Sequence, residues 1–99
     1  MIVVRNVFRL KFGQARPALA LMKESMEIMK RAGMKAPRRV LTDLVGPSYT
    51  LVLEHSYESL TAFEKDVPSV MGSDEWKQWY QKFVPLVDSG YREVYNVVE

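Results

Sequence analysis

Few side chains in this sequence are of a type that commonly takes part in catalysis. His55 is the single histidine among 99 residues, and it lies in an apolar-rich segment two positions before Tyr57. An imidazole that titrates near neutral pH can act as a general base. We therefore regard His55 and Tyr57 as catalytic candidates. The alternative, a packed or surface histidine without a catalytic role, stays open.

Charged residues on segments expected to be strands form a second group. Arg5 and Arg9 alternate with apolar residues near the N-terminus, and Asp43 and Glu54 occur on later strand segments. Charges in the interior are costly unless they are paired or bound to a ligand. Arg5 is therefore a candidate for orienting an anionic or enolic substrate. The other three are candidates for binding it, with ion pairing or exposure at a strand end as the alternative.

Aromatic residues form the third group of candidates. Trp76 and Trp79 lie at helical spacing, and Tyr95 lies on the last expected strand. These side chains could line a ligand pocket. Aromatic residues at helical spacing are also typical of a hydrophobic core, so both interpretations are kept.

Composition argues against several classes of site. The chain has no cysteine, which excludes disulfides and thiol nucleophiles, and a lone histidine cannot form an ordinary zinc site. There is no nucleophile elbow and no glycine-rich phosphate loop. We therefore expect neither a metal nor a cofactor.

Charge and hydropathy limit the partners in the same way. The net charge is +2 and the basic residues are dispersed, which is not typical of a nucleic-acid-binding protein. No apolar run approaches the ~18 residues of a transmembrane helix. The first residues, Met1-Ile2-Val3-Val4-Arg5, do not resemble a signal peptide. We expect a cytoplasmic protein that binds neither nucleic acid nor membrane.

The candidate residues must be positioned by alternating strands and amphipathic helices. Glycine, proline and capping serine residues divide the chain into strand, helix, strand, strand, broken helix and strand. This β-α-β-β-α-β order predicts one α+β domain over residues 1–99, ferredoxin-like, with a four-stranded antiparallel sheet. The expected strands are 2–12, 38–45, 49–57 and 91–98, and the first helix spans 15–32. The second helix starts at Leu60, is disturbed by Pro68 and ends at Gly72. A further helical segment starts after Ser73 and continues to Pro85.

The strands carry apolar residues on both faces, whereas the helices can cover only one. Val3, Val7 and Val52 would lie on the uncovered face. A four-stranded face measures about 400 Å² in projection, which is as large as the apolar patch that a monomer usually exposes. Two such faces packed together would bury about 800 Å² per partner, which is an ordinary interface. The pattern therefore predicts a homodimer that closes into an α+β barrel.

Short motifs in this chain resemble a known group of proteins. These are Leu51-Val52-Leu53-Glu54, followed by a tyrosine and Glu58-Ser59-Leu60, and Ser73-Asp74-Glu75-Trp76-Lys77, followed by Pro85-Leu86-Val87. In these features the chain resembles dimeric α+β barrel proteins, most closely NIPSNAP-type domains and next antibiotic-biosynthesis-type monooxygenases. The group includes cofactor-free oxygenases, isomerases and haem-handling enzymes. Asp74-Glu75-Trp76 occupies the stretch where some members carry a haem-ligating histidine, which argues against haem here.

Two functions follow as expectations. One is a homodimeric small-molecule-binding protein acting as a cofactor-independent oxygenase or isomerase on an aromatic or enolisable substrate inside the barrel. The resemblance, the strand arginines and Tyr95 motivate it together with His55 and Tyr57. The alternative is a non-catalytic ligand-binding or protein-interaction dimer of the NIPSNAP type.

Overall fold

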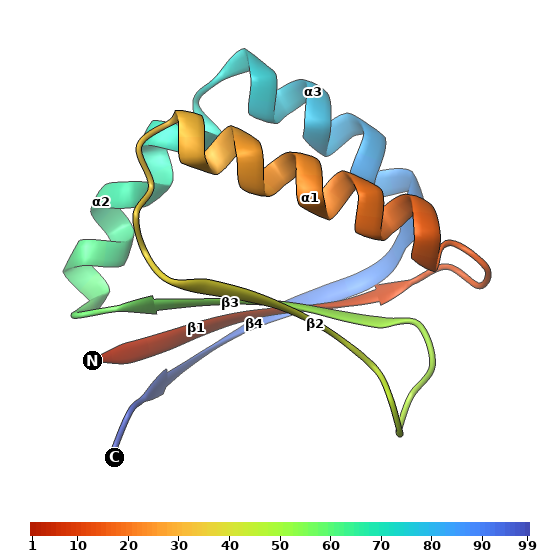
Figure 1. The fold of residues 1–99 in the computed structure, drawn as a ribbon, viewed down its shortest axis with the longest axis horizontal. Coiled ribbons are helices and arrows are strands. Elements are labelled where there is room, and N and C mark those ends of the chain that lie inside the picture. Colours follow the sequence, from red (N-terminus) through yellow and green to blue (C-terminus); the bar gives the residue numbers. More distant parts are fainter.

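The computed structural model describes residues 1–99 and contains one antiparallel sheet with all helices on one side (Figure 1). The strand order in the sheet is β2-β3-β1-β4. The predicted β-α-β-β-α-β arrangement is confirmed, with the second helix broken into two. The elements are β1 (Ile2–Leu10), α1 (Ala15–Arg31), β2 (Arg38–Thr42), β3 (Thr50–Tyr57), α2 (Leu60–Met71), α3 (Asp74–Phe83), the 3₁₀ turn η1 (Val84–Leu86) and β4 (Val87–Asn96).

Two serine caps set the starts of the later helices, as the sequence predicted. The Ser59 hydroxyl accepts a hydrogen bond from the Ala62 backbone N–H at 3.2 Å, and the Ser73 hydroxyl accepts one from the Trp76 N–H at 3.2 Å. Each bond satisfies a backbone donor that the helix itself cannot. Pro68 lies inside α2 without ending it, and the helix runs to Met71. A new cap at Ser73, rather than the proline, therefore separates the two helices.

Five strand boundaries differ from the predicted ones, two of them, the start of β3 at Thr50 and the end of β4 at Asn96, by only one or two residues. The predicted strand 2–12 ends at Leu10, and the predicted strand 38–45 ends at Thr42, beyond which Leu44 and Val45 are almost fully exposed. These apolar side chains extended the strand pattern without lying in the sheet. The last strand begins at Val87 rather than at residue 91.

Gly90 explains the longer last strand. It pairs with Phe8 of β1, and a Cβ atom at this position would lie 2.9 Å from Phe8 Cδ1. The glycine that suggested a loop in the sequence is thus a strand residue that leaves room for the Phe8 ring.

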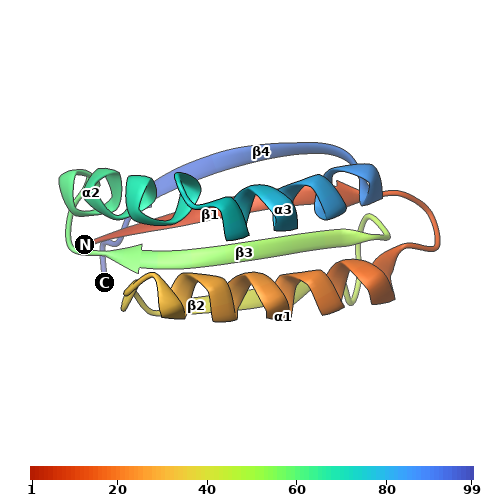
Figure 2. The same ribbon diagram turned by 90° about the horizontal axis from the view of Figure 1, so that it is seen from above.

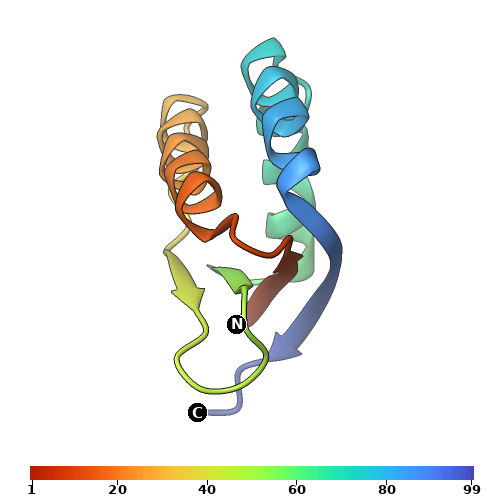
Figure 3. The ribbon, with the colours of Figure 1, turned by 90° about the vertical axis from the view of Figure 1, so that its right-hand side faces the viewer.

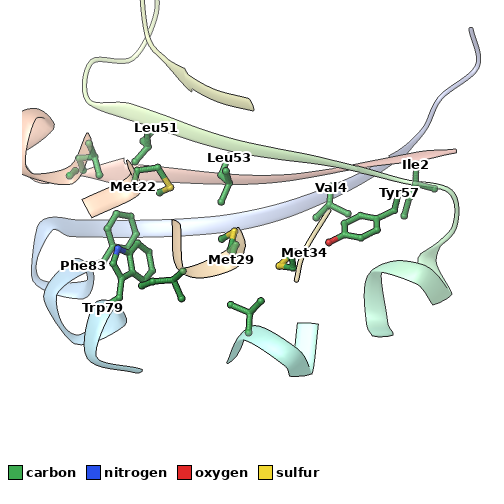
Figure 4. Close-up of a cluster of buried hydrophobic side chains, with 14 residues drawn as sticks. Ile2, Val4, Met22, Met29, Met34, Leu51, Leu53, Tyr57, Trp79 and Phe83 are labelled. Carbon is green, nitrogen blue, oxygen red and sulfur yellow. The ribbon is translucent and has the colours of Figure 1, made fainter. Parts of the chain in front are cut away.

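The hydrophobic core lies between the sheet and the helices. Figure 2 shows α1 running along the sheet beside α3, and Figure 4 shows core side chains from the strands and from α1 and α3 meeting in this layer. Val4 and Leu51 are fully buried and Met22 is 1% exposed. We call this side of the sheet the helix face.

The opposite side of the sheet, here called the open face, has no helix over it (Figure 3). The strand registers place fourteen side chains there, at alternate positions of the four strands. Val7 and Val52 are buried at its centre by their neighbours, whereas Tyr91 is 57% exposed and Tyr95 47%. The sequence-based inference that the second face carries large apolar side chains is therefore confirmed at these positions.

Candidate ligand site between the sheet and the helices

A cavity of about 240 Å³ lies between the helix face and the helices. Ligand pockets usually measure about 300–1,000 Å³, so this space lies just below that range and fits only a small ligand. Its wall is mostly apolar and includes Met22, Met29 and Phe83, which Figure 4 shows within the core layer. Its three polar lining residues are Asn6, His55 and Arg92, and the tyrosines Tyr57 and Tyr80 also line it.

Strand alternation places the two central candidates at this cavity. His55 and Tyr57 follow Leu51 and Leu53 on the same face of β3, and all four side chains are buried. The imidazole and phenol rings lie with their centroids 6.2 Å apart. The two residues are two positions apart on one strand, so strand alternation alone was sufficient to place them on the same face.

His55 is a buried histidine with an unpaired ring nitrogen. It is 5% exposed, and its Nε2 has no hydrogen-bond partner. Burial, and next the positive charge of Arg38, lowers the pKa of His55 from 6.5 to about 4. The imidazole is therefore neutral at pH 7 and can exchange a hydrogen bond with a bound molecule.

Tyr57 supplies a second buried polar group at the cavity. Its side chain is buried, its hydroxyl has no well-formed hydrogen bond, and Figure 4 shows that hydroxyl directed into the core layer. Burial, and next the neighbouring Asp66 carboxylate, raises the pKa of Tyr57 above its usual value. The phenol therefore keeps its proton and can donate it in a hydrogen bond. Buried polar groups without partners are uncommon in folded proteins, so such a group at a cavity is available to a bound molecule.

A guanidinium group borders the same cavity. Arg92 of β4 pairs in register with Asn6 of β1 and donates from Nε to Asn6 Oδ1 at 2.9 Å. Its guanidinium carbon lies 5.3 Å from the centroid of the Phe63 ring, within the range of a cation–π contact. This places one positive charge at the wall of a mostly apolar space.

Trp76 and Trp79 both line the cavity, and they also belong to the packed layer. The Trp79 ring is stacked on Phe83 with a centroid distance of 4.9 Å, and its indole N–H donates to the Leu21 carbonyl at 2.5 Å. The core and ligand-lining interpretations therefore both describe these residues.

The charged candidates lie elsewhere. Arg5, Arg9, Glu54 and Tyr95 are on the open face, as their strand registers require. Asp43 follows β2, and its carboxylate accepts a hydrogen bond from the Thr50 backbone N–H at 2.9 Å.

Each of these charged or polar side chains already has a partner within the chain. Arg5 Nε lies 3.0 Å from Glu54 Oε2. Arg9 donates to the Thr50 hydroxyl at 2.8 Å, and the Tyr95 hydroxyl donates to Glu93 at 2.5 Å. The ion-pair alternative therefore describes Arg5 and Glu54.

The predicted grouping of Arg5 with His55 and Tyr57 in one catalytic set does not correspond to the geometry. Arg5 occupies an odd position of β1 and pairs with Glu54, whereas His55 pairs with Val4. Neighbouring residues of a strand point to opposite faces, so the sheet itself separates Arg5 from the imidazole.

Asn6 and Arg92 were not selected as site residues from the sequence. Asn6 stood out as a polar residue on the more apolar side of its segment, which is the signal that could have identified it. Arg92 became recognisable only through the β1–β4 register, which places it opposite Asn6.

No three histidine, aspartate or glutamate side chains are grouped in a way that could hold a metal ion. Every helix in the structure is too short or too polar to cross a membrane.

Comparison with known sequences gave no match, either among family models or among curated proteins. Comparison with solved structures gave many. A NIPSNAP family protein of Agrobacterium tumefaciens superposes with a TM-score of 0.88 at 16% identity, over 99% of this chain and 86% of the other.

Two further structures resemble the chain. A NIPSNAP domain protein of Burkholderia xenovorans gives a TM-score of 0.87 at 15% identity, covering 99% and 95% of the two chains. A putative antibiotic biosynthesis monooxygenase of Nitrosomonas europaea gives 0.75 at 15% identity, with both chains fully covered. The chain therefore has the fold of NIPSNAP-family proteins and, more distantly, of antibiotic-biosynthesis-monooxygenase-like proteins, in the order that the sequence motifs indicated.

Proposed function

We propose that this protein is a homodimer that binds a small aromatic or enolisable molecule in the cavity between its sheet and helices. The observation that supports this function best is the buried His55 Nε2, which has no hydrogen-bond partner, at a mostly apolar cavity that Tyr57 also lines. An apolar ligand body would lie against the aromatic and methionine side chains. An oxygen atom of the ligand would accept the Tyr57 hydrogen bond.

The location differs from the barrel interior expected from the sequence. That expectation placed the ligand on the open face, between two subunits. Instead, the cavity lies on the other side of the sheet and is lined by a single chain. Ligand binding and dimer formation would then use opposite faces of the same sheet.

Catalysis is a second candidate function, supported by the same two residues. An imidazole near an enolisable carbon could remove a proton while the Tyr57 hydroxyl stabilises the resulting oxyanion, as in an isomerase. A base with a pKa of about 4 is weak at neutral pH, however, because proton transfer to it is unfavourable. Burial of His55 therefore favours binding over turnover.

The homodimer is supported by the open face. A single chain would leave Tyr91, Tyr95 and part of Val3 in contact with water. Covering this face with a second copy would remove roughly 800 Å² of surface per subunit, typical of a specific interface.

Ligand binding is tested with a thermal-shift screen of small aromatic acids, phenols and 1,3-dicarbonyl compounds. We expect at least one compound to raise the unfolding temperature of the native chain, because a ligand that binds only the folded state stabilises it. Tyr57→Phe should abolish most of this shift. Tyr95→Phe, which removes the same hydroxyl from the open face, is the matched control and should leave it unchanged.

The competing outcomes have distinct meanings. A screen without any stabilising compound, or equal shifts in the native chain and Tyr57→Phe, would contradict the proposed site. Conversion of a stabilising compound by the native chain, lost in His55→Gln, would favour the enzyme. Binding without conversion would favour the non-catalytic alternative.

A further inference from the structure

Arg92 is the one arginine or lysine of the cavity wall, and only part of its guanidinium group is engaged. Its Nε donates to Asn6 Oδ1 at 2.9 Å, and its guanidinium carbon lies 5.3 Å from the centroid of the Phe63 ring. These two contacts orient the group. Its two terminal nitrogens form no hydrogen bond within the chain, and no carboxylate lies within ion-pair distance of them. The forked end of Arg92 is therefore available to a ligand.

Two arginines of the open face are engaged differently. Arg5 Nε lies 3.0 Å from one carboxylate oxygen of Glu54, and Arg39 Nη2 lies 2.6 Å from the other. These guanidinium groups have a counter-charge on the same sheet. Arg92 lies on the helix face, where the only hydrogen-bond partner of its side chain is the neutral amide of Asn6. The chain itself therefore supplies no counter-charge for Arg92.

Aromatic contacts connect Arg92 to the buried end of the cavity. The Phe63 ring that contacts Arg92 also packs against the Tyr57 ring, with centroids 5.3 Å apart. The Tyr57 ring lies 6.2 Å from the imidazole of His55, and all four residues line the same cavity of about 240 Å³. Arg92 is exposed, whereas His55 and Tyr57 are buried. The cavity therefore has a charged end at the surface and an uncharged polar end inside, so one small molecule can contact both.

The charges around this cavity do not balance. Burial has the largest effect on the pKa of His55 and lowers it. Nearby charges also act on this pKa: Arg38 and Arg92 lower it, whereas Asp66 raises it. Because His55 itself is neutral at pH 7, two positive charges and one negative charge act here. A ligand with one negative charge would complete the balance.

We propose that the ligand of this cavity is a small aromatic carboxylate whose carboxylate group binds the terminal nitrogens of Arg92 and whose ring lies among the methionine and aromatic side chains of the wall. This inference rests on the proposed ligand-binding function and names the class of ligand and its anchoring residue. Two parallel hydrogen bonds from a guanidinium fork match the geometry of a carboxylate. A neutral ligand would leave the fork to water, and a cationic ligand would be repelled.

The test compares compounds of equal shape and different charge. Phenylacetate, cinnamate and indoleacetate are each paired with the corresponding amide, and their dissociation constants are measured by titration calorimetry. At least one acid should bind the native chain about tenfold more tightly than its amide, because a charge-assisted bidentate contact replaces a neutral one.

Two variants locate the source of this preference. Arg92→Gln should weaken binding of that acid about tenfold and leave its amide unchanged, so the amide also reports whether the variant is folded. Arg16→Gln makes the same change of charge at an exposed residue of α1 outside the cavity wall, and it should leave both affinities unchanged. Equal binding of the acid by the native chain and Arg92→Gln, or equal weakening by Arg16→Gln, would overturn the proposed anchor.

The native chain gives a further measurement that needs no substitution. Binding of the acid should weaken as the salt concentration rises, whereas binding of the amide should not. Acid binding that is insensitive to salt, equal affinities for each acid and its amide, or binding of uncharged compounds alone would overturn the carboxylate while leaving the ligand-binding function intact. Failure of these compounds and of the whole thermal-shift screen to bind would instead refute the proposed function.

Discussion

Burial of His55 should make this protein less stable as the pH falls from about 7 to about 5. The folded chain holds the pKa of His55 at about 4, against 6.5 for an exposed imidazole. Between these values the unfolded chain takes up a proton that the folded chain does not, so falling pH favours unfolding. The contribution of neutral His55 to the free energy of unfolding is complete above the pKa of His55 in the unfolded chain. It is lost as the pH falls towards the pKa of His55 in the folded chain.

The size of this effect follows from the two pKa values. A difference of 2.5 between 6.5 and about 4 corresponds to roughly 3 kcal/mol over the whole range, of which about 2 kcal/mol is lost by pH 5. Carboxylates titrate mainly below pH 5, so a measurement near pH 5 limits their contribution to the change in the free energy of unfolding.

Urea unfolding of the native chain and of His55→Gln, near pH 7 and near pH 5 at one protein concentration, measures this effect. The free energy of unfolding should fall by about 2 kcal/mol more in the native chain than in His55→Gln. Equal losses in the two proteins would refute the argument, because they would show that His55 titrates alike in the folded and unfolded chains.

Three further substitutions test the packing. Gly90→Ala should lower the free energy of unfolding, measured by thermal denaturation, by about 1–2 kcal/mol, because the new Cβ would displace the Phe8 ring. An unchanged stability would show that the ring moves freely. Met22→Ala should cost about 2–5 kcal/mol in urea unfolding, since Met22 is 1% exposed, and a loss below 1 kcal/mol would contradict tight packing there. Arg31→Ala should cost less than about 1 kcal/mol by the same measurement, because its ion pair with Glu75 is half-exposed, and a larger loss would show a role beyond that pair.

The fold could be predicted from local signals in the sequence. Alternation defined the faces of β1 and β3, and the serine caps located the starts of α2 and α3. These signals depend on each residue's near neighbours in the chain. The short β2 was less predictable, because Leu44 and Val45 continue the apolar pattern into an exposed turn.

The site was predictable only in part, for a geometric reason. Strand alternation along β3 correctly placed His55 and Tyr57 on the same face of the sheet. Arg5 alternates in step with Val3 and Val7, which were expected on the uncovered face, so its separation from His55 followed from alternation and was overlooked; the pairing of Arg5 with Glu54 shows it directly. Arg92 was concealed because no local pattern encodes the register between β1 and β4, which pairs it with Asn6.

Proton NMR of His55 tests the proposed ligand site most directly. The chain has one histidine, so one set of imidazole carbon-bound proton signals reports on this cavity. A compound that stabilises the native chain should shift these signals in proportion to the bound fraction, and should shift them little in Tyr57→Phe at the same concentration. Binding of that compound to the native chain with unchanged His55 signals would place the ligand elsewhere and contradict the proposed site.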